Sequence, residues 1–441
     1  MTNAAHQPRL VYTCVVSDFN LPELEACTIR RPDEVVLVVS DQYKTQAQRL
    51  IRALGQLDPP PRVLDLHRRN THVALGGDDA LANQRWVQKV LLPILNDSSR
   101  AGAQHWLNLN GGTKVMGVCL MNAHGWHGVD YRAVGDRRIQ SVRWDQNQRR
   151  FLRDRILKLT PDPVSAIQVA QLHADHVSQD SRNPIGDPQL AQRIWNAEKD
   201  RAPDLCAILD ALAKVWEDRT RASQDAKLSW DSVLNPTGKH QPDRKDAIDS
   251  DSSKQRPSRS GIKAWLNRFN SLLSAQDLGP IHWDKAGIRI ERRKLRKKQY
   301  KHWRAWLMGD WLEQLAASWL LDEGLPESAL ARNLKSGITE DRSGDKREAD
   351  LLVHYAGRTS LIEIKAGLPE GAEAKTIEQQ LSSLGDRFGR TNKGLLIAPN
   401  LQHQFERSGR RWEDFKLRCQ AGKVTLLTDR ESVVTFIRRP K

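Results

Sequence analysis

The chain has 441 residues, 39% of them apolar, with 14 tryptophans, five scattered cysteines and a formal net charge of +15. That length predicts two or three domains, and the lack of any long apolar run argues against a membrane span. The cysteine spacing excludes a disulfide framework and a cysteine-type zinc site, and with no leader-like N-terminus it favours a cytoplasmic protein. The positive charge favours polyanionic partners, chiefly nucleic acid.

Residues 1–145 alternate between strand and helix patterns. Strands are expected at 9–16, 34–40, 62–66 and 105–110, helices at 21–31, 43–57, 79–96 and 115–124, and a final hairpin at 129–134 and 139–144. Repeated β-α units predict an α/β domain with a mostly parallel sheet covered by helices. Such sheets bind ligands at the carboxyl ends of their strands.

Polar residues follow three of these strands, where the carboxyl ends should share one edge. They are Ser17, Asp18 and Asn20 after the first strand, Ser40 and Asp41 after the second, and Gly111, Gly112, Thr113 and Lys114 after the fourth. The two glycines permit close approach by a ligand, and the following helix start offers free N–H groups to a phosphate. A plain turn with a helix cap fits the same four residues equally well.

The middle of the chain, residues 146–260, has a polar, helical pattern and is expected to be a connector. Trp195, Trp216 and Trp230 are its predicted packing anchors, and the stretch 235–260 has the composition of a flexible linker. Further on, residues 291–304 hold nine Lys, Arg and His side chains in fourteen positions. This cluster is either a solvated helix face or a phosphate contact, and the sequence leaves both open.

Residues 261–441 read as a second α/β domain. A helix is expected at 303–321, strands at 349–355 and 360–364, a helix at 374–388, and strands at 394–398 and 424–428.

Three residues of that domain have the pattern of a hydrolytic metal site. Asp350 begins one predicted strand, while Glu363 and Lys365 end the next and share a face because they are two residues apart. Mg²⁺ and Mn²⁺ prefer carboxylate and carbonyl oxygens, so the backbone carbonyl of Ile364 is a further candidate ligand. The lysine can stabilise charge that develops in a transition state. An ordinary Glu–Lys pair at a strand end is the simpler alternative.

Around these residues the chain resembles the PD-(D/E)XK nuclease superfamily, in the stretches GDKREAD and IEIKAG. The resemblance implies an additional metal-directed acid at Glu313 and suggests Glu348 as an outer carboxylate. Gln380 is a weaker candidate, and His354 is expected to face solvent or neighbouring side chains. The sequence departs from the family's common pattern at Ile364, where a cysteine is usual, and at Arg347, where an asparagine is usual; neither change removes a metal ligand.

The N-terminal part resembles the CARF domain, a Rossmann-like sensor of cyclic oligoadenylates, in the stretches SDFNLPELEA, VVSDQYKTQAQRL and NLNGGTKVMG. A CARF domain followed by a PD-(D/E)XK domain resembles the ancillary nucleases of type III CRISPR systems. That resemblance implies a homodimer activated by cyclic tetra-adenylate, which cleaves DNA, RNA or both with Mn²⁺ or Mg²⁺. A ligand-responsive nucleic-acid-binding regulator and a ligand-independent restriction or repair nuclease are the alternatives.

Overall fold

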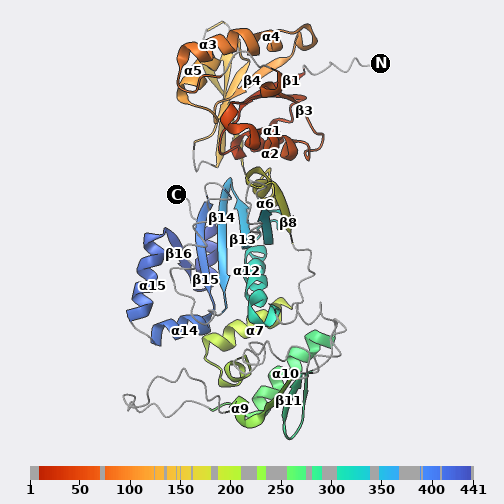
Figure 1. Cartoon of the computed structure of the whole chain (residues 1–441), viewed down its shortest axis with the longest axis vertical. Helices are drawn as coiled ribbons and strands as arrows, with labels where there is room; N and C mark the ends of the chain where they lie inside the picture. The colour runs from red at the N-terminus through yellow and green to blue at the C-terminus, as the bar shows by residue number, and fades with distance from the viewer. Residues whose placement is uncertain are drawn as a thin grey trace.

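The structure, a computed structural model, consists of two α/β bodies stacked along the long axis of the molecule, with a smaller unit at the far end (Figure 1). It describes residues 9–69, 75–123, 125–133, 137–145, 147–148, 150–159, 162–179, 187–209, 226–234, 256–274, 281–290, 305–337, 347–366, 388, 391–407 and 410–438.

The N-terminal body contains a seven-stranded sheet in the order β3-β2-β1-β4-β5-β6-β7. Its strands are β1 (Leu10–Val15), β2 (Glu34–Val38), β3 (Arg62–Asp65), β4 (Gln104–Asn108), β5 (Gly128–Tyr131), β6 (Arg138–Asp145) and β7 (Arg150–Lys158). The first five in sheet order are parallel, which confirms the prediction, and β5 and β6 form the predicted hairpin. The strand β7 was not predicted, so the first body extends past residue 145.

Helices cover both faces of this sheet. They are α1 (Leu21–Arg30), α2 (Lys44–Leu54), α3 (Ala80–Trp86), α4 (Leu92–Leu95) and α5 (Lys114–Ala123), with short turns η1 (Asp41–Tyr43), η2 (Leu66–Arg69), η3 (Val87–Leu91) and η4 (Ser98–Arg100). Alternate residues of β1 explain the two layers, because Tyr12 packs with α1 and α2 whereas Val15 packs with α3 and α5. The covering helix changes sides between β1 and β4, which makes their carboxyl ends the topological switch point.

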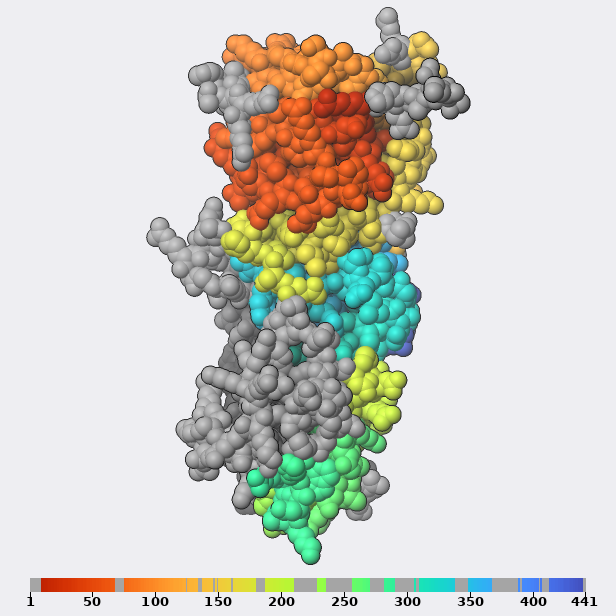
Figure 2. Space-filling view, turned by 90° about the vertical axis from the view of Figure 1, so that its right-hand side faces the viewer, coloured from red at the N-terminus to blue at the C-terminus, as the bar shows by residue number. Residues whose placement is uncertain are grey.

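The helix α6 (Ala166–His173) lies between the two bodies. Its residues Val169 and Leu172 belong to the core of the N-terminal body, while Ala166 and Ala170 pack into the core of the C-terminal body. In the view turned by 90° this part of the chain forms a band between the upper and lower bodies (Figure 2). In this part, the predicted helical connector is therefore a helix that packs into the cores of both bodies.

The C-terminal body contains a six-stranded mixed sheet in the order β16-β15-β14-β13-β12-β8. Its strands are β8 (His176–Gln179), β12 (Leu330–Gly337), β13 (Arg347–Tyr355), β14 (Arg358–Lys365), β15 (Thr391–Ile397) and β16 (Val424–Leu427). The helices around it are α12 (Trp311–Asp322), α14 (Pro399–Arg407), α15 (Arg410–Ala421) and α16 (Arg430–Arg438), with the turns η7 (Trp306–Asp310) and η8 (Glu327–Ala329). The strand β8 comes from the region predicted to be a helical connector, so that region contributes a strand to the sheet as well as helices.

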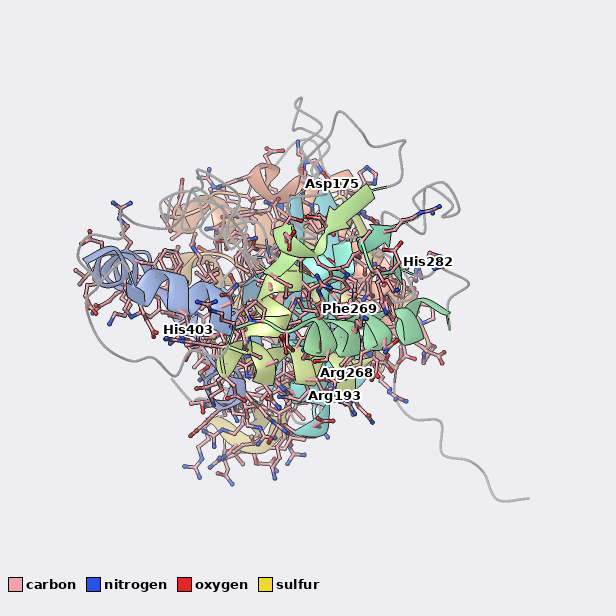
Figure 3. All side chains as sticks on the ribbon, turned by 90° about the horizontal axis from the view of Figure 1, so that it is seen from below. Asp175, Arg193, Arg268, Phe269, His282 and His403 are labelled. Atoms are coloured by element: carbon pink, nitrogen blue, oxygen red, sulfur yellow. The ribbon has the colours of Figure 1, made fainter. Side chains whose placement is uncertain are left out.

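A three-stranded antiparallel sheet forms the far end of the molecule. It contains β9 (Ala226–Ser229), β10 (Ile281–Trp283) and β11 (Gly287–Ile290), and the nearby helices are α7 (Pro188–Lys199), α9 (Trp230–Leu234) and α10 (Arg259–Ser274). Seen from below, α10 carries an exposed Arg268 beside a fully buried Phe269 (Figure 3).

Some predictions concern residues outside the described ranges. These are Trp216, most of the linker 235–260, the basic cluster 291–304, and nearly all of the helix expected at 374–388. Trp195 and Trp230, by contrast, are buried anchors as predicted. None of the helices in the described part of the chain is long and apolar enough to cross a membrane.

Candidate functional site

The strands β13 and β14 pair from Tyr355–Arg358 to Leu351–Ile362 and then diverge. Beyond the last pair, the carboxylate of Asp350 accepts a hydrogen bond of 2.7 Å from the backbone N–H of Ile364. On β14, Lys365 Nζ donates to Glu363 Oε1 over 2.6 Å. The structure therefore brings Asp350, Glu363 and Lys365 together at one place, called here the strand fork (Asp350, Glu363, Ile364 and Lys365).

The charges at the strand fork oppose one another. Burial, and then the charge of Glu363, raise the pKa of Asp350 to about 7. Burial lowers the pKa of Lys365, but the two carboxylates outweigh it and the net shift is upward. Acidic groups held together away from water are unfavourable unless a cation compensates them, and this arrangement is typical of functional sites.

Two buried oxygens at this place have no hydrogen-bond partner, namely Glu363 Oε2 and Glu313 Oε2. Such atoms cost free energy unless a ligand satisfies them. Among the described residues, no three His, Cys, Asp or Glu side chains lie close enough to hold an ion by themselves. With Asp350, Glu363 and the Ile364 carbonyl as its expected ligands, a Mg²⁺ or Mn²⁺ ion would need water or phosphate oxygens to complete its shell.

Glu313 lies in the first turn of α12, directly after the turn η7. Its pKa is raised well above the ordinary value by burial and then by the charges of Asp350 and Asp310. This proximity is consistent with the role that the resemblance implies. The sequence analysis missed Asp310, and also Asn333, whose side chain hydrogen bonds to Glu313 and which adopts a left-handed backbone with φ of 49°.

The remaining candidates of this domain lie less centrally. Glu348 has a side chain that is 38% exposed and lies 3.9 Å from Lys335 Nζ across the neighbouring strand, so it belongs to the rim. Gln380 lies outside the described residues. His354 is not at the surface but fully buried, with Nδ1 3.2 Å from Thr359 Oγ1 and Nε2 3.4 Å from Glu25 Oε1.

In the N-terminal body, β1, β2 and β4 are parallel neighbours, so the loops that follow them lie at one edge, as predicted. The side chain of Asn20 is buried and holds its own loop: Oδ1 accepts from the Ser17 N–H at 2.9 Å, and Nδ2 donates to the Ser17 carbonyl at 2.9 Å. Asp18 is exposed. In this state Asn20 shapes the loop, and Asp18 is the side chain that faces outward.

The loop after β2 is occupied by local contacts. Ser40 is partly buried, and the exposed carboxylate of Asp41 lies 2.8 Å from Lys44 Nζ and 3.0 Å from His67 Nε2. These two hydrogen bonds lower the pKa of Asp41. Its charge is thus already shared with two neighbours.

The loop after β4 approaches the end of β1 closely. A Cβ atom on Gly111 would lie 1.7 Å from the Val15 carbonyl oxygen, and Gly112 has φ of +77°. Both positions therefore require glycine. Thr113 Oγ1 accepts a hydrogen bond from the Met116 N–H at 3.2 Å, as a helix cap does, and donates to the Gly77 carbonyl at 2.9 Å. Lys114 is exposed at the start of α5.

One residue at this edge escaped the sequence analysis. Glu23, on α1, is fully buried, and neither of its carboxyl oxygens has a partner. Its Oε1 lies next to Gly111, and burial raises its pKa to about 8. In the sequence, Glu23 could be recognised only as an acidic residue on the helix that follows the predicted binding loop.

No protein-family model matches the chain, and no curated protein matches it in sequence. The solved structures that are similar over nearly the whole chain include the following two. Can2 from Sulfobacillus thermosulfidooxidans, in complex with cyclic tetra-adenylate, is 15% identical with a TM-score of 0.60, and 97% of each chain is covered. Protein VC1899 from Vibrio cholerae is 13% identical with a TM-score of 0.62, covering 97% of this chain and 96% of that one. These likenesses show a shared fold, with a Rossmann-like sheet in the N-terminal body.

Proposed function

We propose that the chain is a metal-dependent endonuclease that hydrolyses phosphodiester bonds of DNA or RNA and is activated by cyclic tetra-adenylate. The observation that carries the proposal is the strand fork, where Asp350, Glu363 and Lys365 converge beside two buried carboxylate oxygens without partners. If Glu363 and Lys365 formed only a structural ion pair, they would not require a second carboxyl group beside them. Asp350, with a pKa of about 7, is such a group.

The residues of the strand fork have separate roles in this chemistry. Asp350, Glu363 and the Ile364 carbonyl would hold the ion, and Glu313 would act on it through water from α12. A bound Mg²⁺ or Mn²⁺ supplies Lewis acidity and lowers the pKa of a coordinated water. The Lys365 ammonium, kept protonated by its acidic neighbours, stabilises the negative charge that develops on the phosphate.

The ligand part of the proposal rests on the edge formed by the loops after β1 and β4. These loops flank the switch point of a parallel sheet, and the start of α5 offers N–H groups and the Lys114 ammonium to a phosphate. The Thr113 hydroxyl would join them by giving up its bond to the Gly77 carbonyl. Can2, which shares the fold, was solved with cyclic tetra-adenylate. A cyclic tetranucleotide is two-fold symmetric and suits an isologous interface, so the active form is proposed to be a homodimer.

The nucleic-acid part rests on charge. In the small sheet unit, exposed Arg259 and Arg268 project from α10, with the Arg268 guanidinium 4.7 Å from the ring centre of Trp265 and that of Arg259 5.7 Å from Trp230. Cations on a rigid helix, beside aromatic rings, suit a phosphate backbone. The antiviral setting of a type III CRISPR system follows from the resemblance and belongs to the proposal.

One assay tests the proposal against its alternatives. Purified protein is incubated with supercoiled plasmid and with single-stranded RNA, in Mn²⁺ or Mg²⁺, with and without cyclic tetra-adenylate. We expect cleavage only when metal and ligand are both present. Ligand binding without cleavage would indicate a regulator, and cleavage that ignores the ligand would indicate a restriction or repair nuclease.

A further inference from the structure

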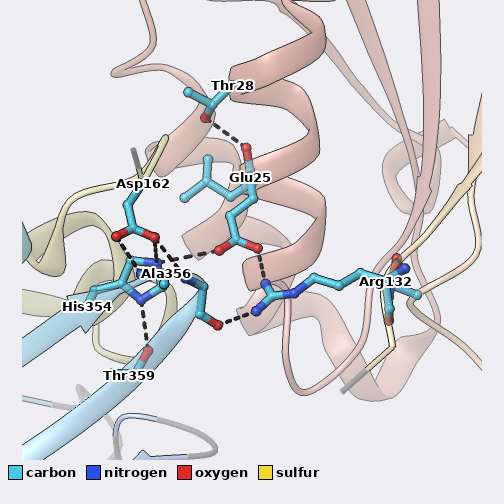
Figure 4. A network of polar contacts seen from close by, with 10 residues as sticks. Glu25, Thr28, Arg132, Asp162, His354, Ala356 and Thr359 are labelled. Atoms are coloured by element: carbon cyan, nitrogen blue, oxygen red, sulfur yellow. Dashed lines mark hydrogen bonds and ion pairs between the residues drawn. The ribbon is translucent and has the colours of Figure 1, made fainter. Parts of the chain in front are cut away.

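Polar contacts join Arg132 and Glu25 of the N-terminal body to the turn of the hairpin that carries the strand fork (Figure 4). Two hydrogen bonds of the Asn110 side chain extend them to the loop after β4. The central residue of this chain of contacts is Arg132, which follows β5 and is 5% exposed. The contacts cross from the N-terminal body to the C-terminal body, between residues 225 positions apart in sequence.

At its N-terminal end the chain of contacts begins beside the proposed ligand loop. Asn110 immediately precedes Gly111 and Gly112. Its Nδ2 donates to the Arg132 carbonyl at 2.6 Å, and its Oδ1 accepts from the Arg132 N–H at 3.1 Å. Two hydrogen bonds therefore tie the backbone of Arg132 to the position of this loop.

In the middle, the Arg132 guanidinium bridges the two bodies. It donates one N–H to the carboxylate of Glu25 on α1 and another to the carbonyl of Gly357, the turn residue between β13 and β14. Gly357 has φ of +71°, and a Cβ atom there would lie 2.7 Å from Arg132 Nη2. The close approach of the arginine thus depends on a glycine in the turn.

At its C-terminal end the same turn is held from a second side. The Asp162 carboxylate accepts from the Ala356 N–H at 2.6 Å and from the Gly357 N–H at 2.8 Å. His354 lies between the acids, with Nε2 3.4 Å from Glu25 Oε1 and 3.9 Å from Asp162 Oδ1. Figure 4 shows these groups converging on the hairpin turn.

The hairpin can transmit a movement of its turn to the strand fork, because β13 and β14 are paired without interruption between the two. Asp350 is six residues from Ala356, which corresponds to about 20 Å along an extended strand. Two other polar contacts between the bodies lie away from the hairpin: Arg49 donates to Asp175, after α6, at 2.9 Å, and Arg137 donates to the carbonyl of Arg438, at the end of α16, at 3.0 Å. Breaking a buried ion pair such as that of Arg132 with Glu25 is costly, which favours discrete arrangements of the bodies over gradual ones.

We propose that Arg132 is a positioning residue that couples the state of the loop Asn110–Lys114 to the geometry of the strand fork. A ligand that shifts the loop moves Asn110, and Asn110 moves the backbone of Arg132. The guanidinium then shifts or releases the Gly357 carbonyl, which reorients the β13–β14 hairpin. This inference rests on the proposed function for its ligand and its readout, but the mechanical link can be measured without either.

The ligand-free test uses hydrogen–deuterium exchange on the full chain. Asn110→Ala removes both hydrogen bonds to Arg132. Asn83→Ala is the control, because the Asn83 side chain likewise makes two hydrogen bonds to backbone groups, but to those of Gly76 and Gly77 before α3. We expect faster exchange at residues 355–360 in Asn110→Ala and not in Asn83→Ala. Unchanged exchange in Asn110→Ala would overturn the coupling, whatever the ligand or the activity proves to be.

The second test uses Arg132→Lys, with Arg30→Lys as the matched control. The side chains of both arginines are 4% exposed and pair with a fully buried carboxylate, but Arg30 pairs with Asp130 inside the N-terminal body. For Arg132→Lys we expect a calorimetric Kd for cyclic tetra-adenylate within roughly threefold of wild type and at least about tenfold weaker activation, the range of ordinary allosteric coupling.

Arg30→Lys should keep its activation ratio even if it lowers Tm. Equal loss of activation in both variants would show that Arg132 is merely structural and would overturn the proposal. If wild type itself shows no response to the ligand, the proposed function fails, and the exchange experiment alone decides the coupling.

Discussion

The polar side chains at the edges of the two sheets differ in how completely they are hydrogen-bonded. At the edge of the N-terminal sheet, the Asn20 side chain bonds within its own loop, Thr113 bonds to Met116 and Gly77, and Asp41 lies between Lys44 and His67. At the strand fork, by contrast, Glu363 keeps a buried carboxyl oxygen without a hydrogen-bond partner, and so does Glu313 beside it. The first edge offers a ligand mainly backbone geometry and an exposed lysine, whereas the second offers unsatisfied charge.

The difference indicates where the molecule gives up stability for function. A loop whose polar side chains are hydrogen-bonded is stable without a ligand, and we expect it to respond to a ligand by changing its conformation. A group of buried acids is destabilising until a cation arrives, as is common at active sites. Glu23 differs from the loop residues of the N-terminal edge, because it lies buried next to Gly111 and neither of its carboxyl oxygens has a hydrogen-bond partner.

The largest expected effect concerns catalysis at the strand fork. Glu363→Gln and Lys365→Ala should each lower the single-turnover cleavage rate by about a thousandfold, because each removes charge that acts directly on the ion or the phosphate. Ligand affinity, measured by calorimetry, should stay unchanged. The control is Glu348→Gln on the rim, for which we expect a loss of no more than a few fold. If Glu363→Gln remained active, the unsatisfied charge that distinguishes the strand fork from the N-terminal edge would not be needed for cleavage.

The next effect concerns the backbone of the N-terminal edge. Gly111→Ala places a methyl group 1.7 Å from the Val15 carbonyl and should lower the free energy of unfolding by about 3 kcal/mol or more, with loss of ligand binding. Gly125→Ala is the control, since its Cβ would meet nothing within 4 Å. Chemical denaturation measures both. Lys114→Ala should lose the ligand response while its stability stays near wild type, and an unchanged response would contradict the pocket assignment.

Glu23 should make the stability of the fold depend on pH, unlike the hydrogen-bonded residues around it. Its pKa is about 8 in the fold, against 4.5 ordinarily, with Glu25, Arg132 and Asp18 as its charged neighbours. The folded chain therefore retains a proton that the unfolded chain loses, so stability decreases as pH rises from about 4.5 to about 8. Between pH 6 and pH 9 the loss should reach about 2 to 3 kcal/mol, since a tenfold change in proton affinity corresponds to about 1.4 kcal/mol.

Glu23→Gln tests this directly, because it cannot titrate. Its Tm should vary less than that of wild type between pH 6 and pH 9. A wild-type profile and a Glu23→Gln profile that run parallel over this range would show that the carboxyl is not held protonated in the fold.

The smallest effect concerns the basic helix of the far unit. Lys263→Ala and Arg268→Ala should each weaken nucleic-acid binding by about two- to fivefold and lower the salt dependence by about one counterion. Lys416 is a matched control, because its ammonium lies 5.5 Å from the Trp412 ring much as Lys263 lies 5.9 Å from Trp230. Fluorescence anisotropy at several salt concentrations checks this. Equal effects at Lys263 and Lys416 would indicate non-specific charge and not a binding surface.

The sequence was most informative where a local pattern carries the structure. The spacing of Glu363 and Lys365 predicted a shared side of one strand, and repeated β-α units predicted the parallel sheet and the shared edge of its loops. By contrast, β8 contains only four residues and is stabilised by pairing with β12, more than 150 residues away. A strand that depends on so distant a partner leaves no periodic signal of its own.

The residues that the sequence analysis missed are those whose roles depend on contacts across the fold. His354 alternates with apolar neighbours in its strand, yet its buried position depends on Glu25 and Asp162 from elsewhere in the chain. Asn333 and Asp310 become neighbours of Glu313 only when β12 and α12 pack together. Arg132 looked like one surface arginine among many, because its partners are a turn carbonyl and a helix carboxylate that no local pattern connects.

The claim on which the account depends is that Asp350 and Glu363 share one divalent cation. Crystals grown with Mn²⁺ test it directly through anomalous scattering. The account predicts a peak about 2.1 Å from a carboxylate oxygen of each residue, with the Ile364 carbonyl as a further ligand, and no such peak in Glu363→Gln. A protein that cuts in Mn²⁺ while its only ordered ion lies elsewhere would contradict the account.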